Sequence, residues 1–189
     1  MFAQDSIDLL KRSGINFEKL KTDGISPADF GELLVPSGLV LNPDIRWISF
    51  HSGYDFGYLL KLLTCVPLPA QEAKFFRLLH LWFPNVFDVK HMMTGVDSLK
   101  GGLNKLASDL GVRCVPSTFV RAVLCAQLMT SFVRLQVARV GPMHQAGSDS
   151  MLTSAVFFEM KRRFFGGADL KKWQGVLYGL GSSTSSSSR

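Results

Sequence analysis

The chain has 189 residues, a hydrophobic fraction of 47% and a formal net charge of +6. This length favours a single domain, and so large an apolar share supports a packed core and excludes wholesale disorder. Three cysteines without a Cys-x-x-Cys spacing argue against a zinc or redox motif and suit a reducing compartment.

Helical signals dominate the start of the chain. Residues 4–13 place apolar side chains on one side and are followed by Gly14, a pattern that predicts a short amphipathic helix. Ser26 to Asp29 has the form of a capping box with proline at the first helical position, which predicts a helix through Leu34. Residues 45–50, β-branched and aromatic, are the strongest predicted strand.

The strand leads into a second candidate capping box, Ser52 to Asp55, and a helix over 56–63. Asp88 follows an apolar segment and is predicted to cap the turn to Lys90, although it could also face the candidate metal site described below. Periodicity predicts a short strand over 86–89 and helices over 71–82, 99–110 and 147–165.

Residues 113–137 differ from the rest of the chain, since fifteen of these 25 residues are hydrophobic and none is acidic. Their longest charge-free run, 122–133, is shorter than the roughly 20 residues that span a bilayer. We therefore expect a buried or partner-facing helix here and no membrane association. The serine-rich tail over 182–189 is low in complexity and is predicted to be disordered, which leaves one domain over 1–181.

Asp55, His144 and Asp149 are the candidates for hydrolytic chemistry. Carboxylate oxygens suit Mg²⁺, and two divalent ions about 3.5–4 Å apart ease phosphodiester hydrolysis. A neutral histidine beside such a site can accept a proton from the attacking water.

Each candidate also has an interpretation that needs no metal. Asp55 completes the capping box with Ser52, and a capping carboxylate still has a second oxygen, so the two roles are compatible. Asp149 falls in the first turn of a predicted helix, where a negative charge is favourable in any protein. His144 is then an ordinary loop residue.

Longer strings around these residues resemble the Caf/Pop-type deadenylase, the RNase-D-like catalytic subunit of the Ccr–Not complex. The strings are Trp47 to Tyr58, Ser98 to Leu103, Val140 to Ser150 and Leu177 to Gly181. The resemblance covers residues 2–112 and 138–181. It implies an α/β fold of the RNase H-like type, with α/β/α layers, and a 3′→5′ exoribonuclease of the DEDD superfamily.

Carried over by position, the resemblance implies that Asp55 and Asp149 are metal ligands and that His144 activates water. It implies two Mg²⁺ (or Mn²⁺) ions as cofactors. The implied partners are the poly(A) tail of mRNA, a Not scaffold subunit and a Ccr-type nuclease. The implied location is the nucleus and the cytoplasm.

Two departures from the family qualify these expectations. The family's first motif, an Asp-x-Glu pair, does not occur in these 189 residues, and residues 113–137 have no counterpart in the family. We interpret the chain as N-terminally truncated with an insertion, an incomplete fold that lacks the N-terminal strands, keeps about two, and is mostly helical. We expect weak or no activity from it alone. The alternative is a catalytically inactive form that acts only as a Ccr–Not interaction protein.

Overall fold

The computed structural model describes residues 3–112, 143–166 and 169–181. The chain divides into two compact units, each of which is described by itself. We call them the helical unit, Met1–Gly24 with Leu99–Phe164, and the sheet unit, Ile25–Ser98 with Phe165–Arg189. The insertion predicted over 113–137 and the tail over 182–189 lie outside the described residues.

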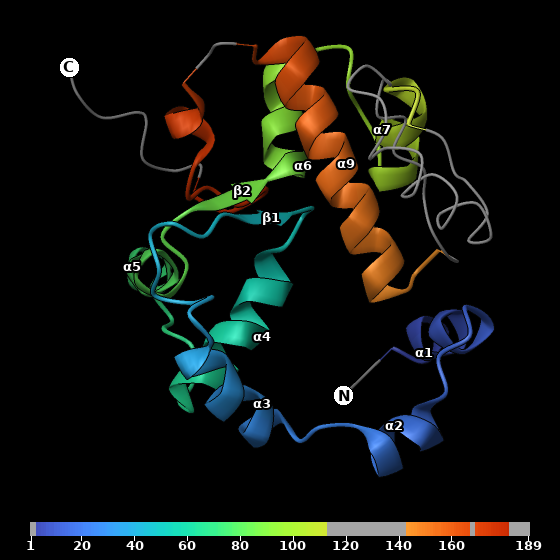
Figure 1. Ribbon diagram of the computed structural model, residues 1–189, viewed down its shortest axis with the longest axis vertical. Coiled ribbons are helices and arrows are strands. Elements are labelled where there is room, and N and C mark those ends of the chain that lie inside the picture. The colour runs from blue at the N-terminus through green and yellow to red at the C-terminus, as the bar shows by residue number, and fades with distance from the viewer. Residues whose placement is uncertain (1–2, 113–142, 167–168, 182–189) are drawn as a thin grey trace, which may run out of the picture. The chain divides into compact units, whose positions relative to one another are not determined.

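The sheet unit contains two short parallel strands, β1 (Trp47–Ser49) and β2 (Val86–Asp88), which lie side by side in Figure 1. Ser49 is paired with Asp88 at the end of this ladder. Helices α4 (Gly53–Thr64) and α5 (Glu72–Trp82) form the connection between the strands. Within its described residues this unit also contains α3 (Pro27–Leu34), η1 (Val35–Ser37), α6 (Val89–Met92), η2 (Met93–Gly95) and η4 (Leu170–Trp173).

An apolar core holds the sheet unit together. Trp47, Phe56 and Phe83 contact one another edge to face, with ring centroids 5.0 to 6.3 Å apart. Burial of such apolar surface is the main favourable term in folding. The buried members of this core come from α3, α4, α5, β2, the loops after η1 and α5, and the C-terminal segment: Leu34, Val40, Phe56, Leu60, Leu79, Phe83, Val86 and Leu177.

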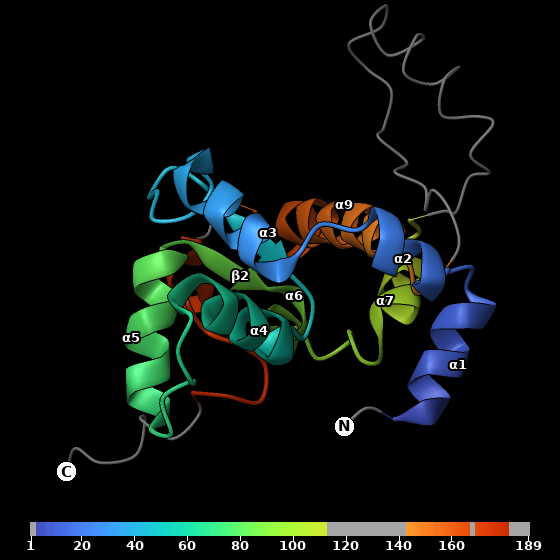
Figure 2. The ribbon, with the colours of Figure 1, turned by 90° about the horizontal axis from the view of Figure 1, so that it is seen from below.

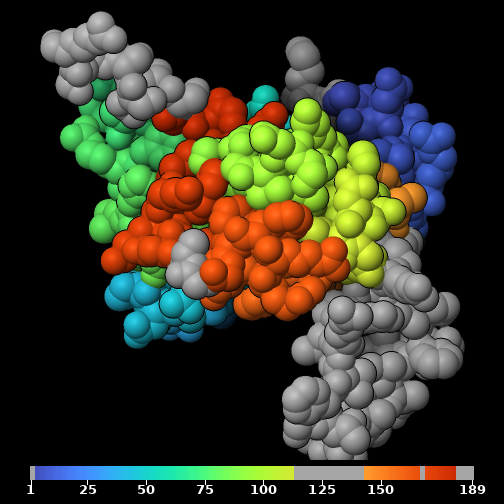
Figure 3. Space-filling view, turned by 90° about the horizontal axis from the view of Figure 1, so that it is seen from above, coloured from blue at the N-terminus to red at the C-terminus, as the bar shows by residue number. Residues whose placement is uncertain are grey.

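The helical unit consists of α1 (Gln4–Arg12), α2 (Phe17–Asp23), α7 (Leu103–Asp109) and α9 (Ala146–Phe164) among its described residues. Helices α7 and α9 pack side by side, as Figures 1 and 3 show. Leu106 of α7, its C-cap residue Leu110, and Val156 and Met160 of α9 are buried. The guanidinium of Arg163 also donates to the Leu110 carbonyl at 2.6 Å.

Most predicted elements are present, with different ends. The predicted helices over 4–13, 26–34, 71–82 and 147–165 are confirmed within about two residues, and Figure 2 shows α1, α3, α5 and α9 from a second direction. The helix predicted over 99–110 begins only at Leu103, and that predicted over 56–63 begins earlier, at Gly53. Helices α2 and α6 were not predicted. None of the described helices has the length and apolarity needed to cross a membrane.

Candidate active site

Asp55 lies in the first turn of α4, where its side chain is exposed. The capping box predicted for Ser52 and Asp55 is wrong. The Ser52 side chain makes no capping hydrogen bond, because its Oγ lies 2.5 Å from the Oγ of Ser49. The Ser52 amide, which a capping box would direct to Asp55, donates instead to Asp88 Oδ2 at 3.3 Å. The Asp55 carboxylate is therefore not used in the way that the capping interpretation requires.

Asp88 ends β2 and is fully buried. It caps α6 as predicted, since its Oδ1 accepts a hydrogen bond from Lys90 N at 2.9 Å. The sequence pattern did not reveal three further donors, the amides of His51, Ser52 and Tyr178. In the sequence, the only sign of these contacts is that a carboxylate directly follows an apolar strand.

His144 and Asp149 flank the start of α9. His144 is exposed and has a left-handed backbone with φ of 62°, and Asp149 is half-buried in the first turn of the helix. The Asp149 amide donates to the Gln145 carbonyl at 2.9 Å, so the turn is regular at this point. The predicted position of both residues at a loop-to-helix junction is confirmed, which places the imidazole and the carboxylate five residues apart on one helix start.

The three candidates belong to different units, Asp55 to the sheet unit and the other two to the helical unit. Among the described residues, no three His, Cys, Asp or Glu side chains gather closely enough to bind a metal ion. The donor chemistry nevertheless fits Mg²⁺ or Mn²⁺, because both candidate ligands offer hard carboxylate oxygens at accessible helix starts. Their residue types therefore suit a divalent metal ion, and their role as ligands stays a prediction.

The remaining histidines have structural contacts. His51 packs edge to face on Tyr178, and His80 Nε2 lies 2.8 Å from the Gly175 carbonyl oxygen. His91 packs against a tryptophan ring. Burial lowers the pKa of His91, and the nearby Asp88 opposes this effect by raising the pKa. Each of these three histidines therefore has a structural contact within its own unit.

The basic end of α9 is tied to an acid. Arg162 Nη2 lies 2.7 Å from Glu159 Oε1, and Arg163 pairs with the same carboxylate. The hydrogen bond from Arg162 is the main cause that lowers the Glu159 pKa to about 2. The two arginines thus already have a local carboxylate partner at the end of the helix, where cations are favourable.

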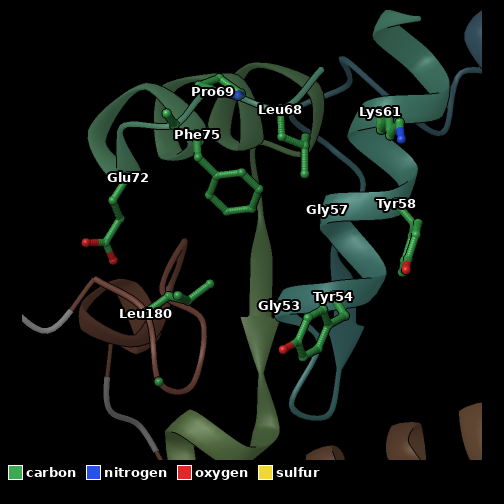
Figure 4. A pocket seen from close by; sticks show the side chains of 12 residues that line it. Gly53, Tyr54, Gly57, Tyr58, Lys61, Leu68, Pro69, Glu72, Phe75 and Leu180 are labelled. Atoms are coloured by element: carbon green, nitrogen blue, oxygen red, sulfur yellow. The ribbon is translucent and has the colours of Figure 1, made fainter. Parts of the chain in front are cut away.

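A cavity of about 700 Å³ opens beside α4. In Figure 4, Leu68 and Phe75 point into the space between α4 and the start of α5. Tyr54 and Tyr58 lie at its edge and are 84% and 72% exposed. None of Asp55, His144 and Asp149 lines this cavity, so it is distinct from the candidate metal ligands.

Residues 41–157, more than half of the chain, match the family described as CAF1 family ribonuclease. A relative from Arabidopsis thaliana, Probable CCR4-associated factor 1 homolog 10, is 47% identical over 96% of this chain and 56% of its own length. Poly(A) ribonuclease pop2 from Schizosaccharomyces pombe is 44% identical over 98% of this chain and 48% of its own length. The chain thus spans about half the length of the curated relatives it matches.

Solved structures of similar proteins also match this chain. The structure of S. pombe Pop2p in its Mg²⁺ and Mn²⁺ bound form is 43% identical, with a TM-score of 0.78 over 95% of this chain and 62% of that one. A second match is to a chain in the structure of the yeast NOT1 MIF4G domain co-crystallized with CAF1. The matched chain is 27% identical, with a TM-score of 0.62 over 87% of this chain and 58% of its own length. The predicted fold class, RNase H-like and mostly helical with about two strands, is confirmed.

Proposed function

Because this chain belongs to the CAF1 family of ribonucleases, we propose that it contributes to a poly(A)-specific 3′→5′ exoribonuclease that shortens mRNA tails in the nucleus and the cytoplasm. The observation that carries this proposal is the 44% identity over 98% of the chain to a protein named Poly(A) ribonuclease pop2. The positions of Asp55, His144 and Asp149 at two helix starts support it.

Asp55 and Asp149 would bind divalent metal ions in this enzyme. The related Pop2p structure is a Mg²⁺ and Mn²⁺ bound form, and carboxylate oxygens suit both ions. When bound, the ions activate water and stabilise the leaving oxygen of the phosphodiester. The two carboxylates lie on separate helices, so their approach to a common site depends on the arrangement of the two units.

His144 would accept the proton from the attacking water. Its side chain is exposed, so a ring nitrogen is accessible to solvent water, and neutral imidazole is a suitable base near pH 7. A general base of this kind contributes about 100-fold to 10,000-fold in rate. Its removal should therefore lower the turnover rate more than it weakens RNA binding.

We expect the 189 residues alone to shorten poly(A) weakly or not at all. They contain no Asp-x-Glu pair, and the described residues gather no group of three metal-ligating side chains. Two carboxylates provide fewer protein ligands for two metal ions than the complete site of the family does. Adding a segment that carries the Asp-x-Glu ligands should therefore restore activity.

The test compares the 189-residue protein with a fusion in which the upstream segment of the S. pombe relative precedes Met1. Each is incubated with 5′-labelled oligo(A) and Mn²⁺ or Mg²⁺, and products are resolved on a sequencing gel. We expect stepwise shortening by the fusion, little by the chain alone, and a loss of about 100-fold or more in the fusion with His144→Ala. Fusions carrying Asp55→Asn or Asp149→Asn should lose activity as well.

Asp29→Asn is the matched control for these variants. Asp29 also lies in the first turn of a helix, α3, where its amide donates to the Ser26 hydroxyl at 3.1 Å. Its substitution should leave the rate of the fusion unchanged. A fusion that shortens oligo(A) equally well with and without Asp149→Asn would contradict the proposed metal site.

A second function is favoured by the similarity to CAF1 co-crystallized with the NOT1 MIF4G domain. On this proposal the chain binds a Not-type scaffold, and through it a Ccr-type nuclease, without hydrolysing RNA. Size-exclusion chromatography of the 189-residue protein mixed with a MIF4G domain should then give a complex that lacks nuclease activity. Separate elution of the two proteins would count against it.

A further inference from the structure

The carboxylate of Asp88 joins three segments of the sheet unit. Its side chain is fully buried, and each of its oxygens accepts two backbone N–H groups. Oδ1 accepts from His51 at 2.8 Å and from Lys90 at 2.9 Å. Oδ2 accepts from Tyr178 at 3.0 Å and from Ser52 at 3.3 Å. Burial of a carboxylate is costly unless it is hydrogen-bonded, and four donors meet that requirement.

Two of these donors belong to the junction between β1 and α4. His51 has φ of 57°, a left-handed conformation that is unfavourable for a residue with a side chain. The hydrogen bond from the His51 amide to Asp88 favours this conformation, and the bond from the next amide secures the residue at which α4 begins. A capping box would direct the Ser52 amide to the Asp55 side chain, and here Asp88 accepts that hydrogen bond instead.

Asp55 follows this junction by three residues. The direction of a side chain in the first turn of a helix depends on where and at what angle the helix begins. We propose that Asp88 is a positioning residue that fixes the β1–α4 junction and thereby the direction in which Asp55 presents its carboxylate to a divalent cation. This inference rests on the proposed function, which assigns Asp55 to the metal. Asp88 itself is not a ligand, because both of its oxygens are occupied by backbone amides.

Asp169 shows what a purely local cap looks like in the same unit. It is the N-cap of η4, and its Oδ1 accepts from Lys171 N at 3.0 Å, the same i to i+2 bond that Asp88 makes with Lys90. Asp169 is exposed, whereas Asp88 is buried and bonds to residues far away in the sequence. The two aspartates therefore share the local cap and differ in the distant bonds.

The experiment compares Asp88→Asn with Asp169→Asn in the 189-residue protein, with Mn²⁺ as the probe. Paramagnetic broadening of the backbone amide signals of residues 53–56 reports binding at Asp55, and Asp55→Asn shows which part of the broadening depends on that carboxylate. We expect Asp88→Asn to raise the Mn²⁺ concentration for half-maximal broadening by about tenfold or more, as loss of a metal ligand's support does. Asp169→Asn should leave it unchanged.

Amide hydrogen exchange supplies a second measurement that does not depend on the folding of a variant. In the wild-type protein the amides of His51, Ser52 and Tyr178 should exchange slowly, since each donates to a buried acceptor. Exchange at His51 and Ser52 as fast as in an open loop would overturn the inference.

The outcomes separate this inference from the proposed function. Broadening near Asp55 in the wild-type protein that is unchanged in Asp88→Asn overturns the role of Asp88 alone. No broadening near Asp55 in the wild-type protein, or broadening that persists in Asp55→Asn, overturns the metal assignment and with it the positioning role. A shift in Asp88→Asn only, together with protected amides, supports both.

Discussion

Helices α4 and α9 both follow a histidine in the left-handed region, His51 with φ of 57° and His144 with φ of 62°. Each helix carries a candidate metal ligand in its first turn. The supports of the two junctions differ. The start of α4 is bonded to a buried carboxylate through two backbone amides, whereas the side chain of Gln145 at the start of α9 donates to the Ser13 carbonyl at 2.7 Å.

This difference shows that one backbone conformation can be stabilised in two ways. At the α4 junction the backbone amides donate and the fully buried carboxylate of Asp88 accepts. At the α9 junction a neutral side chain donates to a backbone oxygen, and Gln145 is only partly buried. Charged hydrogen bonds in buried places are stronger, and their loss costs more, than neutral bonds near solvent. The α4 junction should therefore be the less tolerant of substitution.

The largest expected effect is that of Asp88→Ala, set against Gln145→Ala. The first leaves four backbone N–H groups without their acceptor in a buried place and should lower the free energy of unfolding by about 3–5 kcal/mol. The second removes one neutral hydrogen bond and should cost about 1 kcal/mol. Urea unfolding followed by circular dichroism measures both values.

Gln4→Ala is the control for these two variants, because Gln4 makes an exposed bond to Asp8 within α1. Its effect should be within about 0.5 kcal/mol of zero. Equal losses for Asp88→Ala and Gln145→Ala would remove the distinction between the two junctions.

Local signals were sufficient to predict the capped and strongly periodic helices. The helix after Ser26 was predicted because its cap is made by neighbours in the sequence, and the Asp29 amide does bond to the Ser26 hydroxyl. The same pattern failed at Ser52, whose hydroxyl pairs with Ser49 and whose amide donates to a residue 36 positions away. A capping box and this arrangement have the same local sequence, so only the fold distinguishes them.

The sequence predicts where the candidate site residues lie, but not the hydrogen bonds that hold their helix starts in place. His144 and Asp149 were placed at a helix start from their spacing and from Gly147, and the structure confirms that placement. The helix after the β1 strand was predicted to begin at residue 56, but α4 begins at Gly53, so Asp55 lies inside its first turn. The bonds of Asp88 join segments up to 90 residues apart in the sequence, and short patterns carry no information on such contacts. The roles of the three residues in hydrolysis stay predictions.

Glycine substitutions at the two histidines probe the backbone strain itself. His144→Gly should raise the free energy of unfolding by about 0.5 kcal/mol. Glycine adopts positive φ without strain, which stabilises the folded state, but it also makes the unfolded chain more flexible, which offsets part of this gain. His51→Gly also loses the edge-to-face contact with Tyr178, worth about 0.5–1.5 kcal/mol, and should be neutral or destabilising. Urea unfolding of both variants beside the wild-type protein measures the difference. Equal stabilisation by both would mean that the His51 ring contributes nothing at its junction.

The smallest expected effect concerns the opposite ends of the two helices. Helix α4 ends at Thr64, and the amide of its C-cap residue, Cys65, donates to the Lys61 carbonyl at 3.1 Å. Helix α9 ends beside the pairs of Glu159 with Arg162 and Arg163. Because these pairs lower the Glu159 pKa to about 2, the unfolded chain binds a proton there at higher pH than the folded chain does. This contribution to stability is complete above about pH 5 and is lost as the pH falls toward 2.

Glu159→Gln should therefore lower the melting temperature at pH 7 by less than Gln145→Ala does, since the arginines that pair with Glu159 are partly exposed and such pairs are weakened by solvent. The difference between the variant and the wild-type protein should shrink as the pH is lowered from 5 to 2, because the wild-type carboxylate then becomes protonated and loses its charge. Thermal unfolding at pH 7, 5, 4, 3 and 2 measures this difference. Glu18→Gln in α2 is the matched control, because the Glu18–Lys21 pair has the same i to i+3 spacing but both side chains are largely exposed. A difference for Glu159→Gln that stays constant down to pH 2 would show that packing of this side chain, rather than its charge, stabilises the end of α9.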